Sequence, residues 1–133
     1  MKPSLMHRFT LLLASNEDPH THIAKAKASL DAYFNDTLIW SRVHESSPYG
    51  VMAPDALPYL NAVCQGRTSQ DLEAFIGWLK ALETSMGRRR GVAAKGRVTL
   101  DLDVVTWDDV ILRPVDAERS YYLTCMADLP STV

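Results

Sequence analysis

Residues 98–107 read VTLDLDVVTW, an alternation of apolar and polar side chains that is typical of a β-strand with one buried face. Three apolar side chains should face the core: Leu100, Leu102 and Val104. Thr99, Asp101 and Asp103 should then face the opposite side, which places two carboxylates next to each other. Like charges this close repel each other unless water or a ligand compensates, so this strand raises the question of function as well as of fold.

The hydrophobic pattern outside this strand predicts an alternating series of elements. We expect strands at residues 7–15, 35–45 and 59–66, a helix from about 20 to 34, and a second helix from 72 that Gly87 ends. Thr68 and Asp71 match a capping box at the start of the second helix. Residues 46–58 and 87–97 are predicted loops, 108–112 should start a short hairpin, and 120–127 should form a final strand or helix.

This order of elements predicts an α+β fold, a ferredoxin-like split βαβ sandwich formed by residues 1–133 as a single domain. Two helices would cover one face of an antiparallel sheet, and the active site would lie on the other, open face. On the third strand, Leu60, Ala62 and Cys64 should face the helices. Tyr59 and Asn61 should therefore lie on the open face, where a ligand can reach them.

Composition narrows the class of protein. The chain has 133 residues, of which 47% are hydrophobic and 23% charged, and its net charge is −2. This weak charge argues against bulk binding of nucleic acid or of an anionic membrane surface. The apolar runs are too short to span a bilayer, and the N-terminus lacks the pattern of a signal peptide. Since Cys64 and Cys125 form no CxxC motif, we expect reduced thiols and a monomeric, cytoplasmic protein.

Two groups of charged residues suggest phosphate chemistry. Asp101 and Asp103 suit Mg²⁺, which often takes one or two carboxylates together with substrate phosphates. A solvated strand face with incidental acids is the alternative. Cations precede the pair in the sequence: Arg88, Arg89, Arg90, Lys95 and Arg97. They can neutralise charge during phosphoryl transfer, although a soluble basic loop or an RNA contact is the alternative. No P-loop motif is present to bind the phosphates instead.

Tyr59 and Asn61 suggest a slot for a planar heterocycle. The ring would supply a flat face and the amide would hydrogen-bond the edge of the ligand, next to the proline-rich loop at 46–58. The alternative is that Tyr59 is an aromatic residue at the start of a strand and Asn61 an ordinary polar residue beside a turn.

Five segments, ASN at 14–16, SSPYG at 46–50, YLNAV at 59–63, LE…GR at 82–88 and TLDLDV at 99–104, occur in a characteristic order and spacing. In this they resemble the 6-hydroxymethyl-7,8-dihydropterin pyrophosphokinase family of folate biosynthesis. The resemblance implies a ferredoxin-like fold. It also implies transfer of pyrophosphate from ATP to the hydroxymethyl oxygen of the pterin, with release of AMP.

The resemblance also implies roles for individual residues. Asp101 and Asp103 would hold two Mg²⁺ ions that bridge the phosphates of ATP. Tyr59 and Tyr121 would stack on the pterin, and Asn61 would bond its edge. Three residues would help to define the pterin slot: Ser46, Ser47 and Tyr49. Two cations of a mobile loop would act in catalysis: Arg88 and Arg90. The remaining residues would bind the nucleotide: Lys80, Glu83, Arg97, Arg113 and Arg119.

Departures from the family pattern leave a second function open. Val98 stands where a loop arginine is expected, with Arg97 one place away. The segment after Trp107 is shorter than in the family and lacks a His-Tyr pair that contacts ATP. The alternative to an active enzyme is a non-catalytic or weakly active relative that binds a nucleotide or a pterin. Catalysis is expected if Arg113 and Arg119 reach the phosphates.

Overall fold

The computed structural model describes residues 6–47, 57–89 and 96–130. The elements are β1 (His7–Ser15), α1 (Pro19–Tyr33), β2 (Ile39–Trp40), β3 (His44–Ser46), β4 (Tyr59–Thr68), α2 (Leu72–Ser85), β5 (Asp101–Trp107), β6 (Val110–Ile111), α3 (Pro114–Ala117) and α4 (Ser120–Met126). The strands form one antiparallel sheet in the order β2-β4-β1-β5-β6, with β3 also paired to β4. The predicted α+β, split βαβ fold is therefore confirmed.

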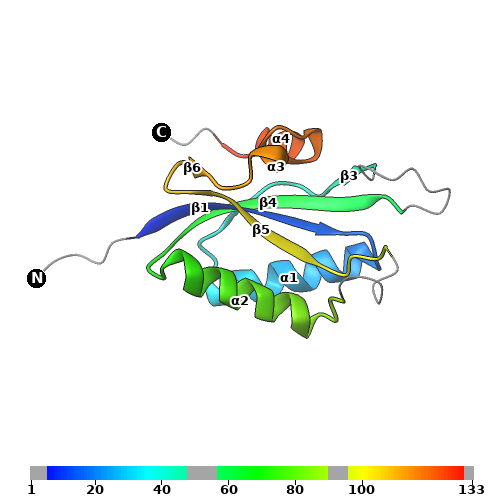
Figure 1. Ribbon diagram of the computed structural model, residues 1–133, viewed down its shortest axis with the longest axis horizontal. Helices are drawn as coiled ribbons and strands as arrows, with labels where there is room; N and C mark the ends of the chain where they lie inside the picture. The colour runs from blue at the N-terminus through cyan, green and yellow to red at the C-terminus, as the bar shows by residue number, and fades with distance from the viewer. Residues whose placement is uncertain (1–5, 48–56, 90–95, 131–133) are drawn as a thin grey trace, which may run out of the picture.

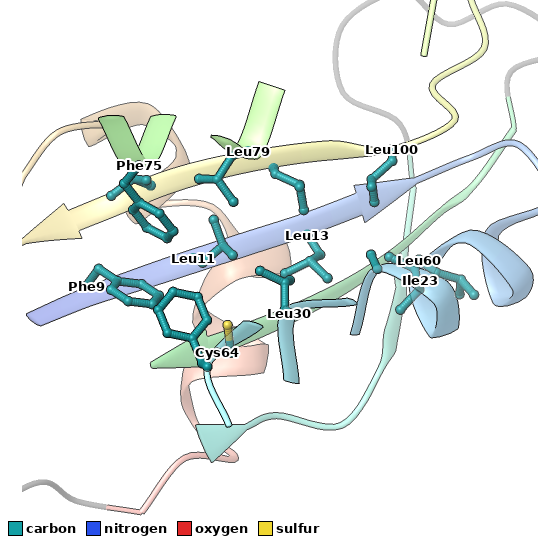
Figure 2. Close-up of a cluster of buried hydrophobic side chains, with 14 residues drawn as sticks. Phe9, Leu11, Leu13, Ile23, Leu30, Leu60, Cys64, Phe75, Leu79 and Leu100 are labelled. Atoms are coloured by element: carbon teal, nitrogen blue, oxygen red, sulfur yellow. The ribbon is translucent and has the colours of Figure 1, made fainter. Parts of the chain in front are cut away.

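The main core lies between the sheet and the two long helices, α1 and α2, which cover the same face (Figure 1). Each helix presents a buried stripe at helical spacing: Ile23, Ala26 and Leu30 from α1, and Phe75 and Leu79 from α2. Figure 2 shows these side chains against alternate residues of the strands. The predicted core-facing residues Leu60, Cys64, Leu100, Leu102 and Val104 all belong to this cluster.

The second face of the sheet is only partly open, which corrects the expectation of a fully open face. The predicted final strand or helix is the helix α4, and it packs on this face (Figure 1). A smaller buried cluster joins them: Leu12, Val63, Val105, Tyr122 and Cys125. Strand alternation also directs the apolar residues Leu12, Val63 and Val105 to the second face. Because their burial requires a covering element, α4 packs there.

The single strand expected at residues 35–45 is wrong, because the chain forms two short strands separated by a bulge. Trp40 pairs with Cys64, whereas His44 pairs with Asn61, so three residues (41–43) lie opposite two (62–63). The Ser41 hydroxyl accepts a hydrogen bond from the backbone N–H of Val63 at 2.9 Å. The extra residue reverses the alternation, and His44 therefore shares the second face with Asn61.

The capping box predicted at Thr68 is also wrong. Thr68 is the last residue of β4 and pairs with His7, so it does not cap α2. The N-cap of α2 is Asp71, whose side chain accepts a hydrogen bond from the backbone N–H of Ala74 at 2.8 Å. Gly87 follows the helix with φ 89°, as expected for a residue that ends it.

The last part of the chain departs from the predictions only in detail. The predicted strand at 98–107 starts at Asp101, and the predicted hairpin closes through Asp108 and Asp109, both at positive φ, into β6. Among the described residues no helix is both long and apolar enough to cross a membrane. Cys64 and Cys125 are free and buried, in agreement with reduced thiols.

Candidate active site

A cavity of about 180 Å³ opens on the second face of the sheet, between the strands and the segment that leads into α4. Its lining comes from β1, β3, β4, β5 and that segment: Leu12, Ala14, Ser46, Ser47, Tyr59, Asn61, Asp101, Asp103, Arg113, Asp116 and Tyr121. Eight of these are residues that the sequence singled out: Ser46, Ser47, Tyr59, Asn61, Asp101, Asp103, Arg113 and Tyr121. The antiparallel register brings them together, because Ala14 pairs with Asn61 on one side and with Asp101 on the other.

Asp101 and Asp103 form the acidic side of the cavity. The Asp103 side chain is only 13% exposed. Its pKa is raised to about 7 by burial, by the negative charge of Asp101 and by a hydrogen bond between the two carboxyl groups. The charges of Arg113 and Lys80 oppose this rise in the pKa. The neighbouring cations therefore do not balance the negative charge of the two carboxylates, a property that suits a cation-binding site.

A third carboxylate holds the backbone between the two aspartates. Glu83 of α2 is 1% exposed, and its Oε2 accepts a hydrogen bond from the backbone N–H of Leu102 at 2.7 Å. Lys80 Nζ lies 3.5 Å from the same oxygen. Because β5 has no neighbouring strand at Leu102 on that side, the carboxylate replaces a ladder acceptor. The Glu83 carboxylate therefore binds a backbone group of the protein itself. Its contact with a nucleotide stays a prediction.

The opposite side of the cavity is polar and aromatic. The side-chain amide of Asn61, 2% exposed, donates a hydrogen bond to Ser46 Oγ at 2.7 Å. The pKa of the Tyr59 hydroxyl is raised by burial and by the charge of Asp101, and the charge of Arg88 opposes this. Tyr59 thus lies within electrostatic reach of the acidic pair. The bulge before β3 is what brings Ser46 to this face, opposite Tyr59 in the ladder.

Arg113 lines the cavity, and Arg88 lies outside its lining but within electrostatic reach of Tyr59. Within the part of the chain that the structure describes, Nε and Nη1 of Arg88 are buried and have no hydrogen-bond partner. Buried polar groups are normally paired, so these nitrogens favour an anionic ligand. Arg113 Nη1 lies 3.6 Å from Asp103 Oδ1. Burial lowers its pKa, but the hydrogen bond to Asp116 and the nearby carboxylates outweigh burial and raise it.

Other predicted site residues lie outside this cavity or outside the described chain. Arg97 and Arg119 are exposed, and Lys80 is half-exposed beside Glu83. Tyr49 and Arg90 lie outside the described residues. Thr99, expected on the open face, is buried and donates a hydrogen bond to Glu17 Oε2 at 3.1 Å.

Asn16, in the ASN segment, holds the approach to β5 in place. Its side-chain amide donates to the Gly96 carbonyl at 3.1 Å, and its side-chain oxygen accepts from the Val98 backbone N–H at 2.5 Å. The conformation of residues 96–98 is therefore tied to the end of β1, two residues after Ala14 of the cavity.

Sequence reasoning missed Asp116 and the larger hollow beside the cavity. Asp116 lies three residues after Arg113 at the start of a short helix, and that spacing of opposite charges was the available signal. The hollow, about 480 Å³, shares Ser46, Ser47 and Tyr121 with the cavity and continues toward His44 and α4. Together they form a longer groove than the strand pattern predicted.

The oxygen donors of the cavity suit some metal ions and not others. Within residues 6–47, 57–89 and 96–130, no group of three or more His, Cys, Asp or Glu side chains could hold a metal. Zinc-type sites, which use three or four protein ligands, do not fit. Mg²⁺ does fit, because it keeps several waters and commonly takes one or two carboxylates plus substrate phosphates.

Comparison with known proteins gives one clear result. The model of the family 7,8-dihydro-6-hydroxymethylpterin-pyrophosphokinase matches residues 10–131, nearly the whole chain. No individual curated protein matches significantly. The matched range includes both aspartates, the aromatic side of the cavity and the segment with Arg113 and Asp116. The chain belongs to the 7,8-dihydro-6-hydroxymethylpterin-pyrophosphokinase family, whose members carry out pyrophosphoryl transfer in folate biosynthesis.

Proposed function

We propose that this protein transfers pyrophosphate from ATP to the hydroxymethyl group of 6-hydroxymethyl-7,8-dihydropterin, in a Mg²⁺-dependent reaction that releases AMP. One observation carries the proposal. A cavity joins a partly buried carboxylate pair, Asp101 and Asp103, to a slot lined by Tyr59, Asn61 and Tyr121. An anionic phosphate chain held by metal ions fits the first part, and a flat heterocycle with hydrogen-bonding edges fits the second.

The residues on the second side would orient the pterin. Tyr59 and Tyr121 offer ring faces, and Asn61 has its amide held by Ser46, so its oxygen can accept from the heterocycle. A pterin held by these three residues would direct its hydroxymethyl group toward the aspartates. Holding both reactants in the same cavity replaces a bimolecular encounter by an oriented one, which lowers the entropic part of the barrier.

On the first side, Asp101 and Asp103 would hold the two Mg²⁺ ions. When bound, these ions neutralise charge on the phosphates and orient them for in-line attack. The hydroxymethyl oxygen forms a bond to the β-phosphorus and its proton is released to water, while the bond from that phosphorus to the oxygen shared with the α-phosphate breaks and AMP leaves. The guanidinium groups of Arg88 and Arg113 would stabilise the negative charge that develops.

The direct test is to mix the protein with ATP, Mg²⁺ and hydroxymethyldihydropterin and to measure AMP. We expect one AMP for each pterin consumed and none when the pterin is omitted. Absence of AMP, with calorimetry still detecting pterin binding, would refute the enzyme and support a binding protein.

The carboxylate pair is tested by replacing both members, Asp101→Ala with Asp103→Ala. We expect loss of Mg²⁺-dependent ATP binding and of AMP release, with the fold retained. A matched control, Glu73→Ala with Glu118→Ala, removes two exposed carboxylates away from the cavity and should leave both properties unchanged. If the double aspartate variant still binds ATP in a Mg²⁺-dependent way, the assignment of the metal ligands is wrong.

One contact favours the second candidate, a non-catalytic relative that binds a nucleotide or a pterin. The Arg113 guanidinium lies 3.6 Å from Asp103 and supplies part of the positive charge that a metal would bring. If Arg113 stays there when ATP binds, Mg²⁺ cannot occupy the pair fully. The AMP assay separates the two candidates, since only the enzyme converts bound ATP.

A further inference from the structure

Asp116 of α3 links the two sides of the cavity through its two carboxylate oxygens. Oδ2 lies 2.5 Å from Nε of Arg113, and Oδ1 accepts a hydrogen bond from the hydroxyl group of Tyr121. The Asp116 side chain is 15% exposed. Arg113 also approaches Asp103, and Tyr121 lies on the side of Tyr59 and Asn61. A single carboxylate thus contacts one residue from each half of the site.

The strengths of these contacts decide where Arg113 lies. Its Nε is 2.5 Å from Asp116, but its Nη1 is 3.6 Å from Asp103. The first contact is a charge-assisted hydrogen bond, and the second is a looser ion pair. Without Asp116, the half-exposed guanidinium would lose its shorter contact and would be free to turn to Asp103 or to solvent. Asp116 therefore keeps Arg113 beside the pair and prevents it from neutralising the pair completely.

The hydrogen bond to Tyr121 has an equivalent consequence for the aromatic side. The Tyr121 ring packs against the second buried cluster, and its hydroxyl end is held separately by the bond to Asp116. The preceding turn of chain is formed by α3, which starts with Pro114. The ring face that Tyr121 offers to the cavity therefore depends in part on the same carboxylate that contacts Arg113.

We propose that Asp116 is a positioning residue that couples the two substrate subsites, holding Arg113 for the phosphates and Tyr121 for the heterocycle. The inference rests on the proposed function for the identity of the two ligands. Asp116 lines the cavity, but its two carboxylate oxygens contact Arg113 and Tyr121, and it acts through these two partners. If Asp116 only stabilised the start of α3, replacing it would lower the melting temperature and leave the affinity for both ligands unchanged.

Three variants separate these readings when the affinities for ATP and for hydroxymethyldihydropterin are measured independently by calorimetry. Tyr121→Phe keeps the ring but removes the bond, and should weaken mainly pterin binding. Arg113→Gln should weaken mainly ATP binding. Asp116→Asn keeps the shape of the side chain, removes its charge, and should weaken both by about tenfold, the equivalent of one charge-assisted hydrogen bond. Glu118→Gln, an exposed neighbour, is the control and should weaken neither.

The outcomes decide the proposal without reference to turnover. It is overturned if Asp116→Asn leaves both affinities unchanged, if it weakens only one of them, or if it only lowers the melting temperature. It is also overturned if the unmodified protein binds neither ligand. If the unmodified protein binds both ligands but releases no AMP, the proposed enzyme fails, and the double effect of Asp116→Asn still supports the coupling.

Discussion

Replacing Asp103 with asparagine should stabilise the metal-free protein at alkaline pH, although it removes a residue proposed to act in catalysis. The pKa of Asp103 is raised from 3.8 to about 7, chiefly by burial and then by Asp101. The folded protein therefore holds this proton more tightly than the unfolded chain does. The resulting stability is fully present below the unfolded-state pKa of 3.8 and is lost as the pH rises through about 7.

The magnitude follows from the shift in the pKa. One unit corresponds to about 1.4 kcal/mol, so ionising Asp103 in the folded protein costs at most about 4 kcal/mol. That cost already includes the opposing charge of Arg113, so it is an upper bound on what asparagine can gain. We expect Asp103→Asn to raise the free energy of unfolding by about 1–3 kcal/mol at pH 8 and to change it little at pH 4.

The assay is urea unfolding of both proteins at pH 4 and pH 8 in the presence of a chelator. The control is Asp108→Asn on the surface. Hydrogen bonds from His7 and from the Arg8 backbone lower the pKa of Asp108, so its contribution is present at pH 8 and lost as the pH falls. This control should lose stability at pH 8. The reasoning about Asp103 is refuted if Asp103→Asn is no more stable than the unmodified protein at pH 8.

Three further substitutions test the packing around the site, each by urea unfolding. Glu83→Leu should lower the free energy of unfolding by about 1–3 kcal/mol, because the buried N–H of Leu102 loses its acceptor. Glu83→Gln keeps an acceptor and should lower it less. Equal losses would contradict the role of this bond. Gly66→Ala should cost about 1–3 kcal/mol, since a Cβ there would lie 2.4 Å from Leu38 Cδ2, and an unchanged stability would show that Leu38 moves freely. Phe75→Ala should cost about 3–5 kcal/mol, because the ring is fully buried among other aromatic rings, and a loss below 1 kcal/mol would show that the core collapses into the space.

The local pattern was enough to predict the main core. Helical spacing identified Ile23, Ala26 and Leu30, and alternation identified Leu100 and Leu102, because one buried face imposes its period on the sequence. The second covered face was missed. Leu12 and Val63 are apolar in strands that are apolar on both faces, and alternation cannot say which element covers the second face.

Strand spacing by itself predicted the candidate site only where its residues share one strand, whereas Ser46, Ser47 and Tyr121 were assigned to it through the family resemblance. Asp101 and Asp103 were assigned to the same face from spacing alone, and Tyr59 and Asn61 likewise. The contact between Asn61 and Ser46 depends on one extra residue between β2 and β3, because that bulge moves even-numbered residues from the helix-covered face to the second face. The sequence around residues 41–43 contains no signal that requires it.

The sequence by itself determined the split βαβ order, the faces of the strands and the pairing of two carboxylates on β5, since these follow from short-range periodicity. Only the tertiary structure decided which groups meet those carboxylates. Glu83 reaches the backbone of Leu102 from a helix, and Arg113, from the segment before α3, lies 3.6 Å from Asp103 on β5. Such contacts join residues that are distant in the chain, and their geometry is set by how the helices pack on the sheet rather than by any local pattern.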